Sequence, residues 1–371
     1  MNRRDLRGGR ELAGTLLDLV LAGGDCVGVV GLAKNCGKTT TLNALIRAAA
    51  ARNMAVGMTS GGRDGELYDA ITGLAKPPIK VPQGALIALA DFTIGRTSCR
   101  LEVVRRLGIH TAAGEIVIAR ALESGQVEVI GCNRTSDLVR AIGQLRECGA
   151  ELVLVDGAAG RTFLASPDVV QTFVLATGAA LDGDIQGIAE ATRMAVHLFT
   201  LPMPPPRVAR RAEQAIQSGV SAVMRLDGRA EALPWTTLLG RESLVAAMLS
   251  QGDAGLVCAR AVGDGLLEAL ASRLREYSAQ PGREAFTVVA ADPSRIAVGD
   301  RGVRAFEAAG GELAVLRKAR VAAVSVNPSS PSGATLDPAG LLIEVSKQVG
   351  ELPVFDMVAE LSASGGVMLE A

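Results

Sequence analysis

The chain has 371 residues, of which 49% are hydrophobic and 21% charged, so it is long enough for two domains and too apolar to be mainly disordered. Its 38 Lys and Arg residues balance its 39 Asp and Glu residues, and only 3% of residues are aromatic, which excludes the basic, aromatic-rich surface of a nucleic-acid-binding protein. Six cysteines without a CxxC pair and only two histidines argue against the usual zinc sites and predict reduced thiols. Because the sequence has neither a signal-peptide pattern nor an apolar run of the ~18 residues that span a membrane, we expect a soluble cytoplasmic protein.

Apolar runs alternate with helix-like segments through the first 200 residues. Leucines at helical spacing predict a helix over 10–22, and an apolar strand follows at 26–30. A second helix is predicted at 39–52 and a second strand at 54–59, and the right-handed crossover between the strands makes them parallel. The alternation predicts an α/β fold with a doubly wound, mainly parallel sheet over residues 1–200. Further strands of this sheet are predicted at 127–130, 152–155 and 172–175.

The region beyond residue 200 is predicted to form two further segments. The stretch LPMPPP (201–206) has four prolines in six residues, which removes backbone donors and predicts a domain boundary. Residues 201–283 are then expected to be a linker followed by a mainly helical segment. The remainder, 284–371, shows the order strand, helix, strand, strand, helix, strand, which predicts a smaller C-terminal α/β domain of ferredoxin-like type.

The stretch VGVVGLAKNCGKTTTLN (27–43) runs from an apolar strand through a Gly-containing loop into a helix, which is the context of a phosphate-binding P-loop. Gly37 would let the backbone approach a phosphate, Lys38 would place a charge on the β- and γ-phosphates, and the Thr39 hydroxyl would ligate Mg²⁺. The strict G-x-x-x-x-G-K-[ST] pattern requires glycine where Leu32 stands, and the nearest glycine, Gly31, lies one residue too early. A chance GKT at the start of an ordinary helix is the alternative. The residues expected to bind the nucleotide in this loop are Lys34, Asn35, Cys36, Gly37, Lys38, Thr39 and Thr40, with Cys36 only filling space.

A P-loop also requires a carboxylate at the end of a neighbouring strand to hold Mg²⁺, and the apolar run 152–155 ends in Asp156. The second strand ends in TSGGRDGE (59–66), where Asp64 is a candidate to reach the metal or to orient the attacking water. Arg63 and Arg161 are candidates to stabilise charge on the γ-phosphate. Plain solvated turns are the alternative for each of these loops. The expected catalytic residues are therefore Lys38, Asp64 and Asp156, and the expected metal ligands are Thr39, Asp64 and Asp156.

The guanine-reading N-K-x-D pattern does not follow Asp156, which favours ATP over GTP as the nucleotide, with Mg²⁺ as its metal. Several stretches together resemble the P-loop subunit of the lysine 5,6-aminomutase reactivase. The resemblance implies a cytoplasmic protein that works with a second ATPase subunit to restore an adenosylcobalamin-dependent aminomutase. The sequence has no cobalamin-binding D-x-H-x-x-G, so we do not expect this chain to hold the corrinoid. The stretches that carry the resemblance are GLAKNCGKTTTLN (31–43), TSGGRDGE (59–66), VDGAAGR (155–161), VLATGAAL (174–181) and RVAAVSVNPSSPSG (320–333).

The leading hypothesis is therefore a Mg-ATP-dependent switch or reactivating chaperone with ATP-hydrolysing activity. Movement of the 59–66 loop would pass to a partner surface. One alternative is a small-molecule kinase or ATP-dependent ligase in which residues beyond 200 form an acceptor pocket. Another is a non-hydrolysing interaction module, motivated by Leu32 standing where glycine is usual. The partners implied by the resemblance are the second ATPase subunit and the aminomutase, with a homo-oligomer left open. Neither nucleic acid nor a membrane is expected as a partner.

Overall fold

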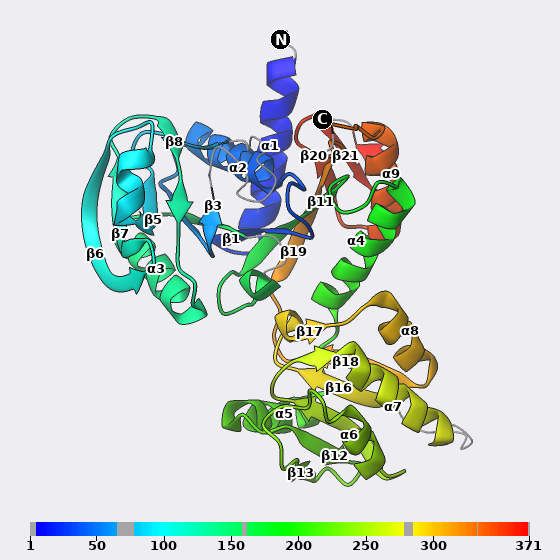
Figure 1. Cartoon of the computed structure of the whole chain (residues 1–371). Helices are drawn as coiled ribbons and strands as arrows, with labels where there is room; N and C mark the ends of the chain where they lie inside the picture. The colour runs from blue at the N-terminus through cyan, green and yellow to red at the C-terminus, as the bar shows by residue number, and fades with distance from the viewer. Residues whose placement is uncertain (1–4, 65–77, 158–161, 278–284, 332, 370–371) are drawn as a thin grey trace. The chain divides into compact units, whose positions relative to one another are not determined.

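The chain divides into two compact units in a computed structural model that describes residues 5–64, 78–157, 162–277, 285–331 and 333–369 (Figure 1). Unit 1 comprises Met1–Val196 and Ala319–Ala371, and unit 2 comprises His197–Lys318. Unit 2 is thus inserted in the sequence of unit 1. Among the described residues, no helix combines the length and apolar character needed to cross a membrane.

Unit 1 is built on a large, mostly parallel sheet with the strand order β22-β21-β20-β19-β11-β1-β10-β2-β5-β7-β6. The seven strands from β20 to β5 in this order pair in parallel, and antiparallel strands lie at both edges. The parallel strands are β1 (Cys26–Gly31), β2 (Val56–Ser60), β5 (Leu86–Ala90), β10 (Leu152–Asp156), β11 (Thr172–Gly178), β19 (Arg320–Asn327) and β20 (Val354–Asp356). The edge strands are β6 (Leu101–Thr111), β7 (Gly114–Ala121), β21 (Leu361–Ser364) and β22 (Val367–Leu369).

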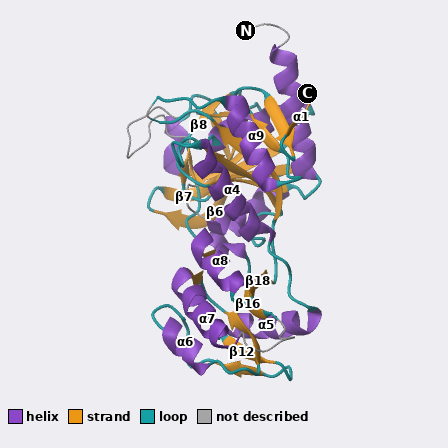
Figure 2. Ribbon diagram, turned by 90° about the vertical axis from the view of Figure 1, so that its right-hand side faces the viewer, coloured by secondary structure: helices purple, strands orange, loops and turns teal. Residues whose placement is uncertain are grey.

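Helices cover both faces of the parallel strands, as Figure 2 shows. On one face α1 (Asp5–Leu21) packs on α2 (Lys38–Ala51), and leucines such as Leu16 and Leu45 share a buried core with alternate strand residues. On the other face α3 (Thr135–Glu147) packs on β2 and β10, and α4 (Ile185–Thr200) is bonded to β11 through Thr192 and Thr177. The helix α9 (Pro338–Val349) packs on β20 and β21. Because both faces are covered, the strands are apolar throughout and not alternating.

The strand order reverses at β1. From β1 the chain passes through α2 to β2, which lies on the β10 side of β1 in the sheet. From β10 it passes to β11, which lies on the opposite side of β1. In open α/β sheets of this kind, ligands bind at the carboxyl ends of the strands next to such a reversal. The loop that follows β1 lies at this position.

Unit 2 has its own five-stranded sheet with the order β13-β12-β14-β16-β18. Strands β14, β16 and β18 are parallel, and β12 and β13 are antiparallel to their neighbours. Helix α5 (Pro206–Ser218) packs through Ala212 on a small buried core with Met224, Val257 and Val289. The strands are β12 (Ala222–Arg225), β13 (Ala230–Ala232), β14 (Asp253–Cys258), β16 (Phe286–Ala290) and β18 (Gly311–Val315), and the other helices are α6 (Glu242–Met248), α7 (Asp264–Tyr277) and α8 (Asp300–Ala308).

Short elements complete both units. In unit 1, β3 (Arg63–Asp64) pairs with β9 (Val129–Ile130), and β4 (Ile79–Val81) pairs with β8 (Gly125–Val127). The predicted strand at 127–130 is therefore wrong as a strand of the main sheet, because its residues lie in these two small ladders. Unit 2 has one further two-residue pair, β15 (Val262–Gly263) with β17 (Ile296–Ala297). Single 3₁₀ turns lie at Asp91–Arg96, Thr162–Ala165 and Pro293–Arg295.

The division into units differs from the predicted one. Residues 201–283 hold strands as well as helices, and the predicted ferredoxin-like domain at 284–371 is not formed. Its strands and helices exist, but β16 and β18 belong to the sheet of unit 2, whereas β19 and β20 extend the sheet of unit 1. The local pattern predicts that a segment is a strand, but the choice of neighbour depends on a partner far away in the sequence, here β11 for β19.

Candidate functional site

The loop between β1 and α2 contains two residues with left-handed backbone conformations. Leu32 N–H still donates to Ala176 O of β11 (2.9 Å), so the strand geometry continues one residue beyond Gly31. Two later residues then have left-handed backbone conformations, Asn35 with φ 61° and Gly37 with φ 91°. Left-handed residues within such a turn form concave groups of amides that bind anions. Glycine at 37 meets the conformational need at no steric cost.

Lys38 is the first residue of α2 and its side chain folds back over the loop. The side chain is only 9% exposed, and Nζ donates to Ala33 O at 3.0 Å and lies 3.9 Å from Cys36 Sγ. A Cβ on Gly31 would lie 2.7 Å from both Lys38 Nζ and Lys38 Cδ. A glycine is therefore needed at residue 31, where the Lys38 side chain passes close to the strand. Leu32 is still paired with β11 and does not need to be glycine.

The threonines after Lys38 divide into two kinds. Thr39 and Thr40 are half-buried in the first turn of α2, where the backbone N–H groups have no acceptor within the helix. The helical hydrogen bonds of α2 begin at Thr41, whose N–H donates to Gly37 O at 3.0 Å. The Thr41 hydroxyl is fully buried and hydrogen-bonded to Ser325 Oγ of β19 (2.6 Å). Thr41 thus fastens the helix to the sheet, and Thr39 and Thr40 remain at the open end of the helix.

Asp156 lies at the carboxyl end of β10, directly beside the strand that leads into the loop. Val29 of β1 is its register partner on one side and Ser60 of β2 on the other. The side chain is 1% exposed, and the backbone carbonyl of Asp156 accepts from Gly61 N–H at 3.1 Å. No group of three His, Cys, Asp or Glu side chains in the described residues is arranged to hold a metal ion. A cation at Asp156 would therefore need oxygen ligands from a bound phosphate and water, as Mg²⁺ commonly takes.

Asn327 is a site residue that the sequence analysis did not assign. It ends β19, and its Nδ2 donates to the carbonyl of Asn35 at 3.0 Å, while Oδ1 accepts from Ser329 N–H at 3.1 Å. Its Cβ would lie 3.0 Å from a Cβ placed on Gly37, so it packs against both left-handed residues of the loop. The sequence could have indicated Asn327, because it is a polar residue that follows an apolar run and precedes Pro328. Such a residue lies at the carboxyl end of a strand, where the ends of parallel strands meet at one edge of the sheet.

The other predicted residues have different outcomes. Lys34 is exposed, and Cys36 is fully buried, with Sγ donating to Ala33 O at 3.0 Å, in agreement with a space-filling role. Arg63 and Asp64 form β3 by their backbones, and their side chains lie outside the described residues. Arg161 also lies outside the described residues. The structure places Lys38, Thr39 and Thr40 in the first turn of α2 and Asp156 at the end of the strand beside β1, and the roles expected of all the site residues stay predictions.

All six cysteines are free thiols, as predicted. Burial raises the pKa of Cys26, Cys132 and Cys258 to about 12, since the thiolate would lose its hydration. These thiols are therefore protonated and unreactive at neutral pH, and none of them is a candidate nucleophile.

Comparisons with protein families, with curated proteins and with solved structures found no match for this chain.

Proposed function

We propose that the chain is a Mg-ATP-dependent P-loop NTPase that acts as a switch. The observation that carries the proposal is the Lys38 ammonium group, held inside the loop by Ala33 O, at the edge where β10 ends in Asp156. A buried lysine above open helix amides favours a ligand with several negative charges, and the carboxylate beside it favours a divalent cation bound with that ligand.

The residues present suit a nucleoside triphosphate with Mg²⁺. The amides of residues 38–40 and the Lys38 charge would hold the β- and γ-phosphates, and Thr39 and Asp156 would hold the metal directly or through water. Bound Mg²⁺ would neutralise charge that develops on the phosphate oxygens during transfer. The absence of an N-K-x-D pattern after Asp156 supports ATP over GTP.

A switch needs a segment whose position depends on the γ-phosphate. The segment after β2 is the best candidate, because Gly61 N–H donates to the carbonyl of Asp156 and couples it to the metal-binding strand. Asp64, three residues further on, would contact the γ-phosphate or its water, and Arg63 and Arg161 would add positive charge. Loss of the γ-phosphate would then release this segment.

The resemblance to the P-loop subunit of the lysine 5,6-aminomutase reactivase supports a specific role for this switch. We propose that ATP drives the restoration of an adenosylcobalamin-dependent aminomutase in the cytoplasm, together with a second ATPase subunit. Co-purification of the tagged chain with the aminomutase and that subunit, dependent on ATP, tests this role. No co-purification in any nucleotide state would contradict it.

The nucleotide site is tested by replacing Lys38 with Ala and measuring ATP affinity by calorimetry in the presence of Mg²⁺. Removing charge-assisted bonds of about 3 kcal/mol corresponds to about a 100-fold weaker Kd. Lys34→Ala is the matched control, since Lys34 lies in the same loop but is exposed, and we expect less than about a threefold change. Equal ATP affinity of the Lys38→Ala and wild-type proteins would refute the site.

The kinetics of ADP formation separate the switch from the two alternative functions. Stimulation by a protein partner alone is expected for a switch, whereas ADP release that depends on a small metabolite would indicate a kinase or ligase. A non-hydrolysing module would bind Mg-ATP without turnover, or show no rise in melting temperature with Mg-ATP if it has no site at all.

A further inference from the structure

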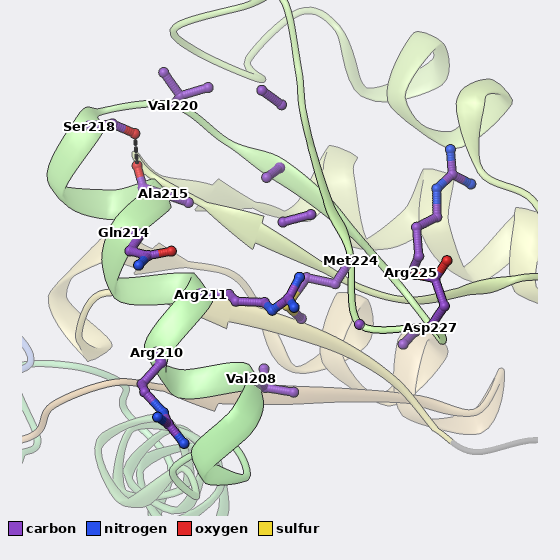
Figure 3. A pocket seen from close by; sticks show the side chains of 15 residues that line it. Val208, Arg210, Arg211, Gln214, Ala215, Ser218, Val220, Met224, Arg225 and Asp227 are labelled. Carbon is purple, nitrogen blue, oxygen red and sulfur yellow. Dashed lines mark hydrogen bonds between the residues drawn. The ribbon is translucent and has the colours of Figure 1, made fainter.

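Unit 2 contains a hollow of about 900 Å³ between α5 and the strands β12 and β13 (Figure 3). This is within the range of cavities that take small organic ligands. Every residue that lines it lies between 208 and 254, so it is formed by unit 2 alone. It shares no residue with the loop that follows β1.

The hollow exists because α5 covers only part of the sheet. The helix packs through Ala212 on Met224, Val257 and Val289 of β12, β14 and β16. At the β13 edge the same face bears small, exposed side chains, since the register pairs Ala222 with Ala232 and Met224 with Ala230. The floor of the hollow is therefore apolar, formed by the buried Ala222 and Met224 and by the exposed Ala230 and Ala232.

The charged groups around this floor are unevenly paired. Arg225 is neutralised by ion pairs with Asp253 and Glu231, and Asp227 is paired with Arg229. Arg210 and Arg211 of α5, by contrast, make no ion pair with any residue that the structure describes. The hollow therefore has an excess of positive charge on its helix wall.

Arg211 is the arginine that reaches into the hollow. Figure 3 shows its side chain crossing from α5 toward Met224, whereas Arg210 points away from the strands. The Arg211 guanidinium group lies near the turn between β12 and β13, with Nη2 3.7 Å from the position of a Cβ on Gly228. A guanidinium group offers a planar pair of donors that match the two oxygens of a carboxylate or phosphate.

We propose that this hollow is a second ligand site, which binds a small organic anion. The anionic group, a carboxylate or a phosphate monoester, pairs with Arg211, and an apolar or aromatic body lies on the alanine floor. The site is independent of nucleotide binding at Lys38. It gives unit 2 a recognition function of its own.

The test uses the full chain and the fluorescent probe 8-anilinonaphthalene-1-sulfonate, which combines an anionic group with an aromatic body. Replacing Arg211 with Gln removes the charge but keeps much of the side-chain length, and we expect the probe to bind about tenfold more weakly. Arg275→Gln is the matched control, because Arg275 is an exposed arginine of α7 in the same unit. Ala230→Phe fills the floor and is expected to abolish probe binding while the circular dichroism spectrum is unchanged.

Competition identifies the anionic group. Phenyl phosphate and benzoate should displace the probe, and the stronger competitor indicates which class the site prefers, whereas neutral benzyl alcohol should not displace it. Unchanged probe affinity in Arg211→Gln, or equal displacement by benzyl alcohol, would overturn the proposal. Lys38→Ala is expected to leave probe binding intact, so failure of the nucleotide site and failure of this site are distinguishable.

Discussion

The loop after β1 and the hollow beside α5 are the two proposed anion sites, and they are built from different parts of the chain. The loop is made of consecutive backbone groups and one buried lysine, held by hydrogen bonds to Ala33 and Asn327. The hollow is made of side chains from a helix and two strands, and its main charged group, Arg211, is exposed. A backbone site is rigid before the ligand arrives, whereas an exposed arginine must be ordered by the ligand at a cost in side-chain entropy.

This difference predicts that the two regions respond differently to an added side chain. Near the loop, a new Cβ at residue 31 meets the side chains of Lys38 and Cys36. In the hollow, a new side chain meets open space and only competes with a ligand. The following substitutions test that contrast, beginning with the largest expected effect.

Replacing Gly31 with Val should weaken ATP binding about 100-fold, close to the effect of Lys38→Ala. The new side chain would occupy the position of Lys38 Cδ and Nζ, 2.7 Å from its Cβ, and would push the ammonium group out of the loop. The same Cβ would lie 2.7 Å from the buried Cys36 Sγ, but all of these atoms belong to side chains of the loop, so the rest of the fold should survive. Calorimetry with Mg-ATP measures the affinity, and thermal unfolding without nucleotide measures the fold.

A matched change in the hollow is Ala230→Val. It should leave both ATP affinity and the melting temperature within error, since Ala230 is exposed on β13. Equal ATP affinity of the Gly31→Val and Ala230→Val proteins would contradict the prediction that the position of the Lys38 side chain requires a glycine at residue 31.

Replacing Asn327 with Ala should weaken ATP binding about fivefold. The change removes the bond of Nδ2 to Asn35 O, a neutral hydrogen bond that contributes about 1 kcal/mol, and it loosens the left-handed turn without touching the phosphate contacts. The affinity should fall without a change in the Mg²⁺ dependence. Asn327→Asp keeps an acceptor for Ser329 but lacks the donor, so it should behave like Ala and not like the wild type.

The smallest effect is expected at Asp356, a second buried carboxylate at the end of a strand of the same sheet. Its side chain is 0% exposed, Oδ1 accepts from Val358 and Ala359 N–H, and burial raises the pKa of the carboxyl above its ordinary value of 3.8. The folded protein therefore retains a proton that the unfolded chain releases, and stability falls as the pH rises from 3.8 through the higher folded-state pKa.

Asp356→Asn keeps the oxygen acceptor and removes the charge. It should be at least as stable as the wild type at pH 7, and the difference should disappear below about pH 4, as followed by thermal unfolding across pH. ATP affinity should be unchanged, whereas Asp156→Asn should lose the Mg²⁺ dependence of ATP binding. Equal losses of ATP affinity in both variants would contradict a metal role specific to Asp156.

Local features of the fold followed from the sequence. Four elements lie within a few residues of their predicted positions. They are the strands β1, β2 and β10 and the helix α2, which begins at Lys38. These elements depend on apolar periodicity and on a turn whose conformation requires Gly37, and both are properties of consecutive residues. The prediction of Lys38 and Asp156 as neighbours also rests on a local rule, that parallel strands end at one edge.

The tertiary structure alone decided which strands pair and which distant residues meet. Asn327 reaches the loop, and Ser325 reaches Thr41 of α2, because β19 pairs with β11 after the insertion of unit 2. The hollow exists because α5 leaves the alanines of β13 exposed. Pairing of strands is chosen by the burial of whole faces against one another, a sum over many distant contacts that no single stretch of sequence contains. For that reason consecutive residues predicted the turn at Gly37 and Lys38, and only the folded molecule revealed that Asn327 bonds to this turn and that a hollow lies beside α5.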